Sequence, residues 1–240
     1  MVNHALLTNL KLMQELIKKM FEVGAHYGYS KATRHPSAEP FIYGTKDGME
    51  IIDLESTAAQ LSAAKEFVTK VAAGKKQIVF VSSKPEAREA VQIAAEKVDQ
   101  PFVSGRWIGG TLTNIDQMKK RIAKLADLKA KESKGELAKY TKKEQLLISR
   151  EIDDLENRFG GLSNMKGYPA AVFVVDPKAE SIAVKEAVKL GIPVIAILNT
   201  DCSANMVDYP VYANDANRHS IKLFVDEIAT AYEEGTKRQS

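Results

Sequence analysis

The chain has 240 residues, of which 45% are hydrophobic, and this is enough for one α/β domain with a substantial core. With 34 basic and 31 acidic residues, its formal net charge of +3 excludes neither an enzyme nor a polyanion-binding protein. The single cysteine, Cys202, excludes a fold that depends on an internal disulfide and predicts a reducing, cytoplasmic environment. No apolar run approaches the roughly 18 residues of a membrane span, and we expect no signal peptide at the N-terminus.

The N-terminal part of the sequence predicts one helix, a long loop and two short strands. Apolar side chains recur at helical spacing over residues 10–21, namely Leu10, Met13, Ile17, Met20 and Phe21. We expect Thr8 or Asn9 to cap this helix and Gly24 to end it. A loop over residues 25–40 leads to strands at 41–43 and 49–53, which flank a turn at Asp47-Gly48.

From residue 56 onward, helices alternate with strands that are apolar along their whole length. The strands are predicted at residues 77–82, 101–103, 171–176, 192–198 and 209–212, and the helices at residues 56–73, 85–97, 179–190 and 217–233. Such strands are typical of a parallel sheet that is buried on both faces. With right-handed crossovers, the pattern predicts a three-layer α/β sandwich of flavodoxin-like or Rossmann-like type, in a single domain over residues 1–240.

Residues 113–159 interrupt this alternation and predict an inserted antiparallel helical hairpin. Apolar residues form one stripe over residues 115–128 and a second over residues 148–159, at steps near 3.5 residues, as in a coiled coil. The stripes consist of Ile115, Met118, Ile122, Leu125 and Leu128, and of Ile148, Ile152, Leu155 and Phe159. The segment carries 12 Lys or Arg and 9 Asp or Glu, which suits either a solvated helix face or contact with RNA.

A doubly wound sheet normally binds a nucleotide at the carboxyl ends of its strands, but the sequence contains neither of the glycine-rich phosphate loops. The strand at 77–82 runs into Ser83-Lys84-Pro85, which opens a helix whose free N–H groups are able to bind an anion. We prefer the simpler interpretation that Ser83 caps this helix and Pro85 occupies its first turn. Asp53 and Asp176 also follow strands, and each is better explained as a cap or turn residue than as a ligand for ribose or metal.

The sequence offers no convincing catalytic or metal site. The four histidines, His4, His26, His35 and His219, are not at ligand spacing, and Cys202 has no second cysteine beside it. No nucleophile elbow is present, and a nucleophile pair of Cys202 and His219 is a minor alternative. We therefore expect no catalytic residue, no metal and no required cofactor.

The single tryptophan, Trp107, lies beside Arg106 in a glycine-rich segment, GRWIGGTLTN. Glycines permit tight turns, an arginine forks onto phosphate, and an indole either stacks or fills a core. Thr113 or Asn114 would cap the first hairpin helix, and Gly160-Gly161 mark the return of the hairpin. The segment therefore fits the base of a projecting arm better than a catalytic pocket.

The run RWIGGTLTN resembles the signature R-W-[LI]-G-G-x-L-T-N of the family of small-subunit ribosomal protein S-two. Other blocks match this family in the same order along nearly the whole chain, which is more specific than a single motif. They are GAHYG at 24–28, PFIYG at 40–44, IIDLEST at 51–57, TKKE at 141–144, the LE of the hairpin's return at 155–156, GIPV at 191–194, VDY at 207–209 and NDA at 214–216.

The resemblance implies a sheet domain with a coiled-coil hairpin, bound near the head–body junction of the small ribosomal subunit and without catalytic activity. The implied partners are small-subunit ribosomal RNA, neighbouring small-subunit ribosomal proteins and, as in many bacteria, the large messenger-binding ribosomal protein S-one, with no membrane. The hairpin marks the match as bacterial in type. The candidate RNA-binding residues are His26, Lys31, Arg34, Arg106, Trp107, Thr113, Asn114, Lys142 and Lys143.

Two regions depart from the family pattern. The loop that usually reads G-H-x-x-x-x-W-N-P-K-M has Tyr29 in place of its second histidine and Arg34-His35-Pro36 in place of W-N-P. After the strand at 192–198, Asn199-Thr200-Asp201 replaces aspartate-threonine-asparagine, and one acid of N-D-D-A is lost beside Asp215. An acidic, metal-assisted partner site is therefore not expected in that region of this chain.

A structural protein of the small ribosomal subunit is thus the leading hypothesis. One alternative is an α/β enzyme or sensor that binds a sugar phosphate or nucleotide at Ser82–Lys84 and Asp176; another is a non-ribosomal RNA chaperone. A specific nucleotide would raise the thermal stability of the enzyme or sensor. Co-sedimentation with small subunits separates the ribosomal protein from the chaperone.

Overall fold

The computed structural model describes residues 2–237 of the chain and the side chains of residues 11–237. Its centre is a parallel sheet with the strand order β5-β4-β6-β7-β8. The strands are β4 (Ile78–Val81), β5 (Phe102–Val103), β6 (Ala171–Val175), β7 (Val194–Leu198) and β8 (Tyr209–Tyr212). This is the order of a flavodoxin-like doubly wound sheet, and it confirms the predicted α/β class.

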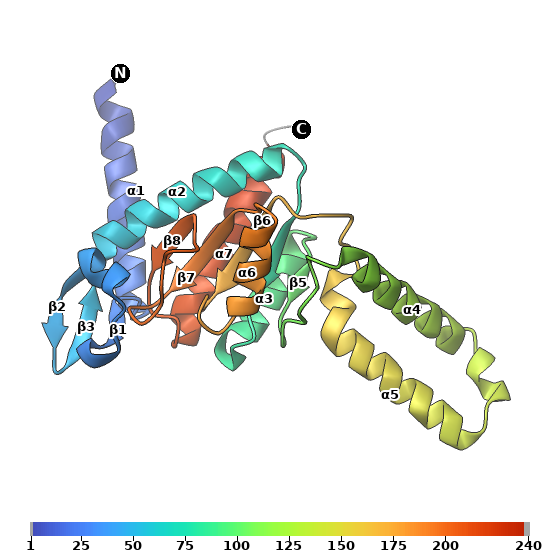
Figure 1. Cartoon of the computed structure of the whole chain (residues 1–240). Coiled ribbons are helices and arrows are strands. Elements are labelled where there is room, and N and C mark those ends of the chain that lie inside the picture. Colours follow the sequence, from blue (N-terminus) through green and yellow to red (C-terminus); the bar gives the residue numbers. More distant parts are fainter. Residues whose placement is uncertain (1, 238–240) are drawn as a thin grey trace.

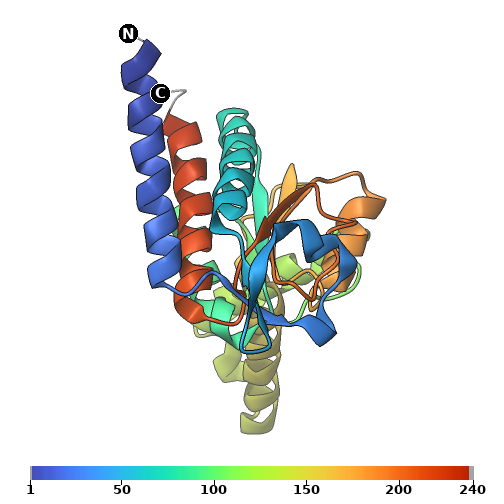
Figure 2. The same cartoon turned by 90° about the vertical axis from the view of Figure 1, so that its left-hand side faces the viewer.

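Successive side chains of each strand enter two different cores, because they point to opposite faces of the sheet. Ile78 and Phe80 face one core, whereas Val79 and Val81 face the other. The first core is covered by α1 (Val2–Glu22), α2 (Leu54–Ala73), α3 (Pro85–Lys97) and α7 (Arg218–Lys237), and the second by α6 (Ser181–Lys189) and the base of the hairpin. Figures 1 and 2 show the resulting layers.

A small antiparallel sheet lies beside the β8 end of the main sheet (Figure 1). Its strands β1 (Tyr27–Ser30), β2 (Ile42–Lys46) and β3 (Met49–Ile52) lie in the order β1-β3-β2. The β2–β3 hairpin and its turn at Asp47-Gly48 confirm the sequence prediction. Strand β1 and two 3-10 turns, Lys31–Thr33 and Pro36–Phe41, lie where the sequence predicted only a loop.

The interruption of the α/β pattern consists of two helices that pack against each other, α4 (Ile115–Ser133) and α5 (Lys142–Phe159), joined through a 3-10 turn at Glu136–Lys139. Thr141 and Glu144 form a capping box at the start of α5, which satisfies free N–H groups there. Six of the nine residues of the predicted apolar stripes are buried in the second core cluster, and Ile122, Leu128 and Ile148 pack against it. The coiled-coil geometry of the pair stays a prediction.

Helix α1 begins at Val2, so the predicted start near Thr8 or Asn9 is wrong. The side chain of Leu10, which the sequence placed in the apolar stripe, lies outside the described side chains. Within residues 2–237, no helix combines the length and the hydrophobicity that a membrane crossing needs.

Gly161 lies where the chain leaves the hairpin and passes the edge strand β5. A Cβ atom at this position would overlap the carbonyl oxygen of Phe102 and lie 2.8 Å from its ring. We predict that Gly161→Ala lowers the free energy of unfolding by about 1–3 kcal/mol, because neither the strand backbone nor the packed ring can yield freely. Chemical denaturation measures this change. Gly167→Ala is the matched control, since its Cβ would meet nothing within 4 Å, and equal effects of the two substitutions would contradict the prediction.

Candidate nucleic-acid interface

The candidate RNA-binding residues lie in three separate groups rather than in one site. The first group lies on or near the small sheet, the second at the base of the hairpin and the third near its far end, so the groups span the long dimension of the molecule (Figure 1). In this order, the groups are His26, Lys31 and Arg34; Arg106, Trp107, Thr113 and Asn114; and Lys142 and Lys143.

His26 is buried and takes part in an aromatic cluster. Its ring stacks on Phe21, with 4.6 Å between ring centroids, and contacts Tyr27 at 4.1 Å. Burial lowers the pKa of His26, and its Nδ1 has no hydrogen-bond partner among the described residues. Lys31, in contrast, is exposed, and no ion pair of Lys31 is found within the described part of the chain. In this group, Lys31 is the side chain best placed to reach a phosphate.

Arg34 compensates a buried carboxylate. Its guanidinium lies 3.3 Å from Glu39 and 3.3 Å from Oε1 of Glu50, whose side chain is 0% exposed. Neither oxygen of Glu50 accepts an aligned hydrogen bond from the described residues, so Arg34 provides the counter-charge within this part of the protein. A carboxylate without a counter-charge in such a place would be strongly destabilising.

The loop before the hairpin is held by one carboxylate, that of Glu186 on α6. Gly110, Leu112 and Thr113 donate backbone hydrogen bonds to it over 2.6, 2.9 and 3.1 Å. The positive φ of Gly110, 93°, is a conformation that glycine adopts without strain. The indole N–H of Trp107 and the hydroxyl of Thr113 add longer contacts of 3.5 and 3.3 Å to the same group.

These hydrogen bonds determine the protonation of Glu186. Burial alone would raise the pKa of this carboxyl group, but the N–H donors of the loop favour its charged form and lower the pKa below the ordinary value. Glu186 is therefore an ionised side chain inside the protein, and the loop at the base of the hairpin supplies its compensation.

The residues of the loop have different accessibilities. Trp107 is 4% exposed and belongs to the second core cluster. Its indole therefore packs in the core and is not accessible for stacking on RNA bases. Its neighbour Arg106 is exposed and has no hydrogen bond or ion pair to any described residue. Thr113 and Asn114 are exposed at the start of α4, where Asn114 occupies the N-cap position without a side-chain cap bond.

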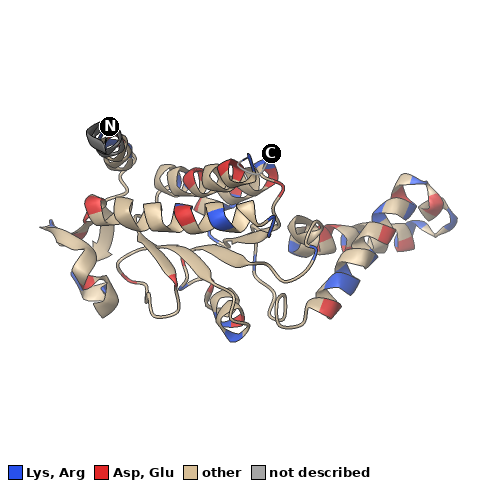
Figure 3. Cartoon of the chain, turned by 90° about the horizontal axis from the view of Figure 1, so that it is seen from above, with Lys and Arg blue, Asp and Glu red and all other residues tan. Residues whose placement is uncertain are grey.

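The third group lies at the start of α5, near the far end of the hairpin. Lys142 and Lys143 are exposed there, and residues 129–143 contain six lysines but two glutamates. Figure 3 shows basic and acidic residues interspersed along the hairpin. Lys129 and Lys131 pair with Glu156 and Asp127, which leaves the basic excess around the turn.

The usual ligand position of a doubly wound sheet is filled by the chain's own charged groups. The strand order reverses between β4 and β6, and ligands of such folds bind outside the strand ends at this point. Here the ammonium of Lys84 lies 2.7 Å from Asp176 and 2.6 Å from Asp215. Burial alone would lower the pKa of Lys84, but the two carboxylates raise it above the ordinary value, so the ammonium stays charged.

The backbone just before α3 also has a partner within the chain. The backbone N–H of Ser83 donates to Glu180 over 2.5 Å. The N-cap residue is Lys84, so the predicted cap at Ser83 is wrong, whereas Pro85 does lie in the first turn. Asp176 accepts hydrogen bonds from the N–H groups of Lys178 and Ala179, as expected for a turn residue, and Asp53 caps α2.

One cluster brings potential metal ligands together without fitting a divalent metal. Ligand atoms of Asp176, Cys202 and Asp215 lie within 4.8 Å of one another. The ammonium of Lys84 already bridges the two carboxylates. Burial, followed by the nearby carboxylates, raises the pKa of Cys202, so the thiol stays protonated. The arrangement is that of an internal ion network, in which the lysine provides the positive charge.

Sequence reasoning missed Glu186 as the residue that organises the loop. A signal was present, because Glu186 lies on the same face of the predicted helix as Ala183 and Ala187, which are buried. A carboxylate on a buried helix face requires donors. The sequence does not reveal where they come from, because the loop lies more than seventy positions earlier in the chain.

We predict that Glu186→Gln lowers the free energy of unfolding at pH 7 by about 1–3 kcal/mol, because an amide replaces a charged acceptor of several N–H groups. The folded-state pKa of Glu186 lies below the ordinary value of 4.5, so its stabilisation is complete above that pH and is lost as pH falls through the folded-state pKa. Urea unfolding at pH 7 and at pH 3 measures this, with a smaller difference between wild type and variant expected at pH 3. Glu89→Gln, at an exposed position of α3, is the control, and a pH-independent loss would contradict the argument.

We predict that Arg34→Ala destabilises the fold by about 3–5 kcal/mol, because it leaves the buried carboxylate of Glu50 without its counter-charge. Adding Glu50→Gln in the same chain should restore part of the stability. Lys31→Ala, which removes an exposed charge from the same region, should change the stability by less than about 0.5 kcal/mol. Thermal and chemical unfolding of the four proteins test this. If Arg34→Ala melts like wild type, the ion pair has no structural role.

Comparison with known proteins identifies the family. The sequence model of the family described as "Ribosomal protein S2" matches residues 20–235. The protein named "Small ribosomal subunit protein uS2" of Chloroflexus aggregans is 40% identical over 93% of this chain and 94% of its own length. Proteins of the same name from Nitratiruptor sp. and Solidesulfovibrio magneticus are 41% and 39% identical, each over 91% of this chain and over 82% and 85% of their own lengths. The chain therefore belongs to the ribosomal protein S2 family.

Proposed function

We propose that this protein is a structural, non-enzymatic component of the small ribosomal subunit that binds small-subunit ribosomal RNA. The match of the family over residues 20–235, with relatives named as small ribosomal subunit proteins, carries this proposal. We also expect contacts with neighbouring small-subunit proteins and with the messenger-binding protein S-one.

The strand-end chemistry supports a scaffold rather than a nucleotide enzyme. In the enzyme or sensor alternative, a phosphate would bind at Ser82–Lys84 and a ribose at Asp176. In this protein Lys84 and Asp176 pair with each other, and the N–H of Ser83 is taken by Glu180. A phosphate would have to displace a carboxylate from that N–H and compete for an ammonium that already has two partners.

The exposed basic groups support contact with RNA at several places. Lys31 on the small-sheet side, Arg106 at the hairpin base, and Lys142 and Lys143 near the hairpin tip all face solvent. Phosphate contacts by such side chains fix the position and orientation of a protein on nucleic acid. Their wide separation suits a protein that braces several RNA segments.

We further propose that the outer part of the inserted segment, residues 113–159, acts as an arm of the single domain. Its base is built into the core, since Ile115, Met118 and Phe159 are buried in the same cluster as Trp107. Farther out, Leu125 and Ile152 are buried within the helix pair itself. The separable arm is therefore shorter than the whole inserted segment.

The proposed function predicts that the native full-length protein co-sediments with small subunits and binds purified small-subunit ribosomal RNA. Since Lys and Arg contacts release counterions, the logarithm of the affinity should fall with the logarithm of the salt concentration, with a slope steeper than about 2. Sucrose-gradient sedimentation and filter binding measure these quantities, with large-subunit RNA as the control. Sedimentation as a free protein, or a marked rise of the melting temperature with a nucleotide, would contradict the proposal.

A further inference from the structure

A solvent-open hollow of about 790 Å³ lies between the sheet domain and the base of the hairpin. Three arginines from three different segments line it: Arg88 on α3, Arg106 in the loop before the hairpin, and Arg158 in the last turn of α5. The other side chains with polar groups are Gln92, Ser104 and Asn157, besides the largely covered indole of Trp107, and no carboxylate lines the hollow. The hollow therefore concentrates positive charge in a protein whose net charge is only +3.

The arginines are largely free to bind an external anion. Arg106 has no hydrogen bond or ion pair to the residues that the structure describes. Arg88 uses only Nε, which donates to the carbonyl oxygen of Ser83 over 3.3 Å. Arg158 pairs with Asp154 over 2.7 Å, but both side chains are more than half exposed. An exposed pair of this kind contributes little, so Arg158 can exchange it for a phosphate.

A rigid scaffold supports the hollow. Arg106 precedes the loop that Glu186 fixes by three backbone hydrogen bonds, and the adjacent Trp107 is buried in the core. Asn157 and Arg158 lie in the last turn of α5, next to the buried Phe159. The binding groups are thus attached to elements that are in place before a ligand arrives, which reduces the entropy lost on binding.

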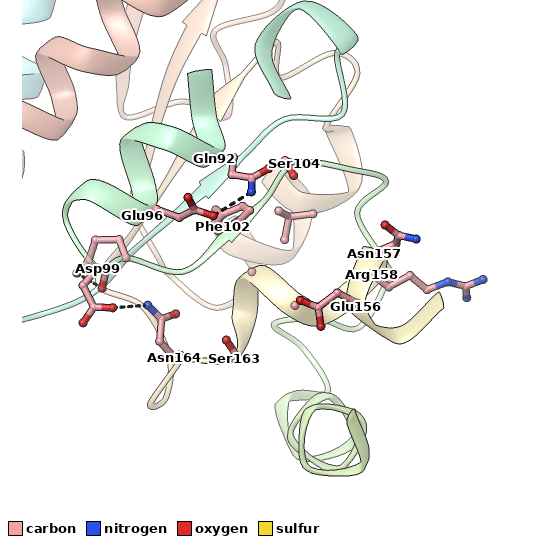
Figure 4. A pocket seen from close by; sticks show the side chains of 14 residues that line it. Gln92, Glu96, Asp99, Phe102, Ser104, Glu156, Asn157, Arg158, Ser163 and Asn164 are labelled. Atoms are coloured by element: carbon pink, nitrogen blue, oxygen red, sulfur yellow. Dashed lines mark hydrogen bonds between the residues drawn. The ribbon is translucent and has the colours of Figure 1, made fainter. Parts of the chain in front are cut away.

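The neighbouring cavity has the opposite character. It shares Gln92, Ser104, Asn157 and Arg158 with the hollow, but Glu156 beside these shared residues and Glu96 and Asp99 on the far side also line it (Figure 4). In Figure 4, Glu96 and Asp99 are held by Gln92 and Asn164. Glu156 is already paired with Lys129, but the carboxylates of Glu96 and Asp99 would repel a polyanion from the far side of this cavity. The repulsion favours a ligand path through the arginine-lined hollow.

We infer that the hollow between α3, the Arg106 loop and α5 is a binding site for the phosphodiester backbone of RNA. Guanidinium groups match phosphate oxygens with two parallel hydrogen bonds, and the side-chain amides of Gln92 and Asn157 add neutral donors. This inference rests on the proposed function, because that function supplies RNA as the polyanion. It adds Arg88 and Arg158 to Arg106 as RNA-binding residues. It also places one RNA contact where the hairpin joins the sheet domain.

The test compares four full-length proteins in binding to purified small-subunit ribosomal RNA. The first is wild type, and the second carries Arg88→Gln, Arg106→Gln and Arg158→Gln. The matched control carries Lys46→Gln, Lys189→Gln and Arg218→Gln, which remove the same charge from exposed positions outside the hollow. The fourth carries lysine in place of Arg88, Arg106 and Arg158, which retains the charge but removes the planar guanidinium groups that make two parallel hydrogen bonds. Circular dichroism melts confirm that all four are folded.

We expect the arginine-to-glutamine protein to lose at least about tenfold in affinity at moderate salt, and its log–log salt slope to fall by about 2, which corresponds to three lost phosphate contacts. The lysine protein should keep the salt slope and recover only part of the affinity. The control protein should stay within about threefold of wild type. An equal loss in the control protein, or an unchanged slope in the arginine-to-glutamine protein, would overturn the inference.

Additional arms separate other ligands and the proposed function itself. If inorganic phosphate or a nucleoside diphosphate stabilises wild type through these arginines while RNA binding is unaffected by their loss, the site binds a small phosphate and the inference is overturned. The inference is also overturned if polyglutamate, an acidic polymer, stabilises wild type through these arginines while RNA binding is unaffected by their loss. If wild type itself neither binds the RNA nor sediments with small subunits, the proposed function fails. If wild type does both and the arginine-to-glutamine protein binds equally well, only the inference about the hollow fails.

Discussion

The carboxylate of Glu186 holds the loop that leads into the hairpin against α6, beside the buried apolar contacts at the base of the hairpin. It lies on a buried helix face, where an ionised group is unfavourable unless several donors surround it. The donors come from the loop that leads into α4, so the loop and the helix stabilise each other. The same contact fixes where Trp107 enters the core, where α4 starts and where Arg106 emerges on the surface. The direction of the arm thus depends on an interaction deep in the sheet domain.

A second internal charge arrangement explains why a nucleotide-binding architecture suits a scaffold protein. In a doubly wound sheet, the strand ends near the reversal of strand order leave unsatisfied polar groups that a ligand normally satisfies. Lys84, Asp176 and Asp215 satisfy each other at this place, while Glu180 accepts the N–H of Ser83 just before α3. The polar groups at these strand ends therefore have their partners within the chain itself. The exposed basic groups proposed to contact RNA lie elsewhere, at the small sheet, near the hairpin tip and where the hairpin joins the sheet domain.

The sequence predicted the parallel sheet and its helices because strands such as β4 and β6 are apolar along their whole length, which only burial on both faces explains. It missed β1, since the four residues YGYS carry a glycine and no alternation, and this strand exists through pairing with β3. The sequence also did not predict which groups surround Glu186 or that Arg88, Arg106 and Arg158 line one hollow. Both depend on contacts between distant segments of the chain. The sequence around a side chain does not show which distant residues it contacts in the fold. The predicted cap at Ser83 is wrong because the helix begins one residue later, with Lys84 as its N-cap and Pro85 in its first turn.

The insertion of the hairpin has a consequence for how the chain folds. Strands β4 and β6 are neighbours in the sheet, yet α3, β5, both hairpin helices and their connections lie between them in sequence. Pairing of the two strands must therefore close a long segment, and contacts between distant positions form slowly. The hairpin helices are joined through a short turn and pack against each other, so their mutual contacts are local. Because the paired helices bring the two ends of the inserted segment together, they shorten the loop that pairing of β4 with β6 has to close, and so lower its entropy cost.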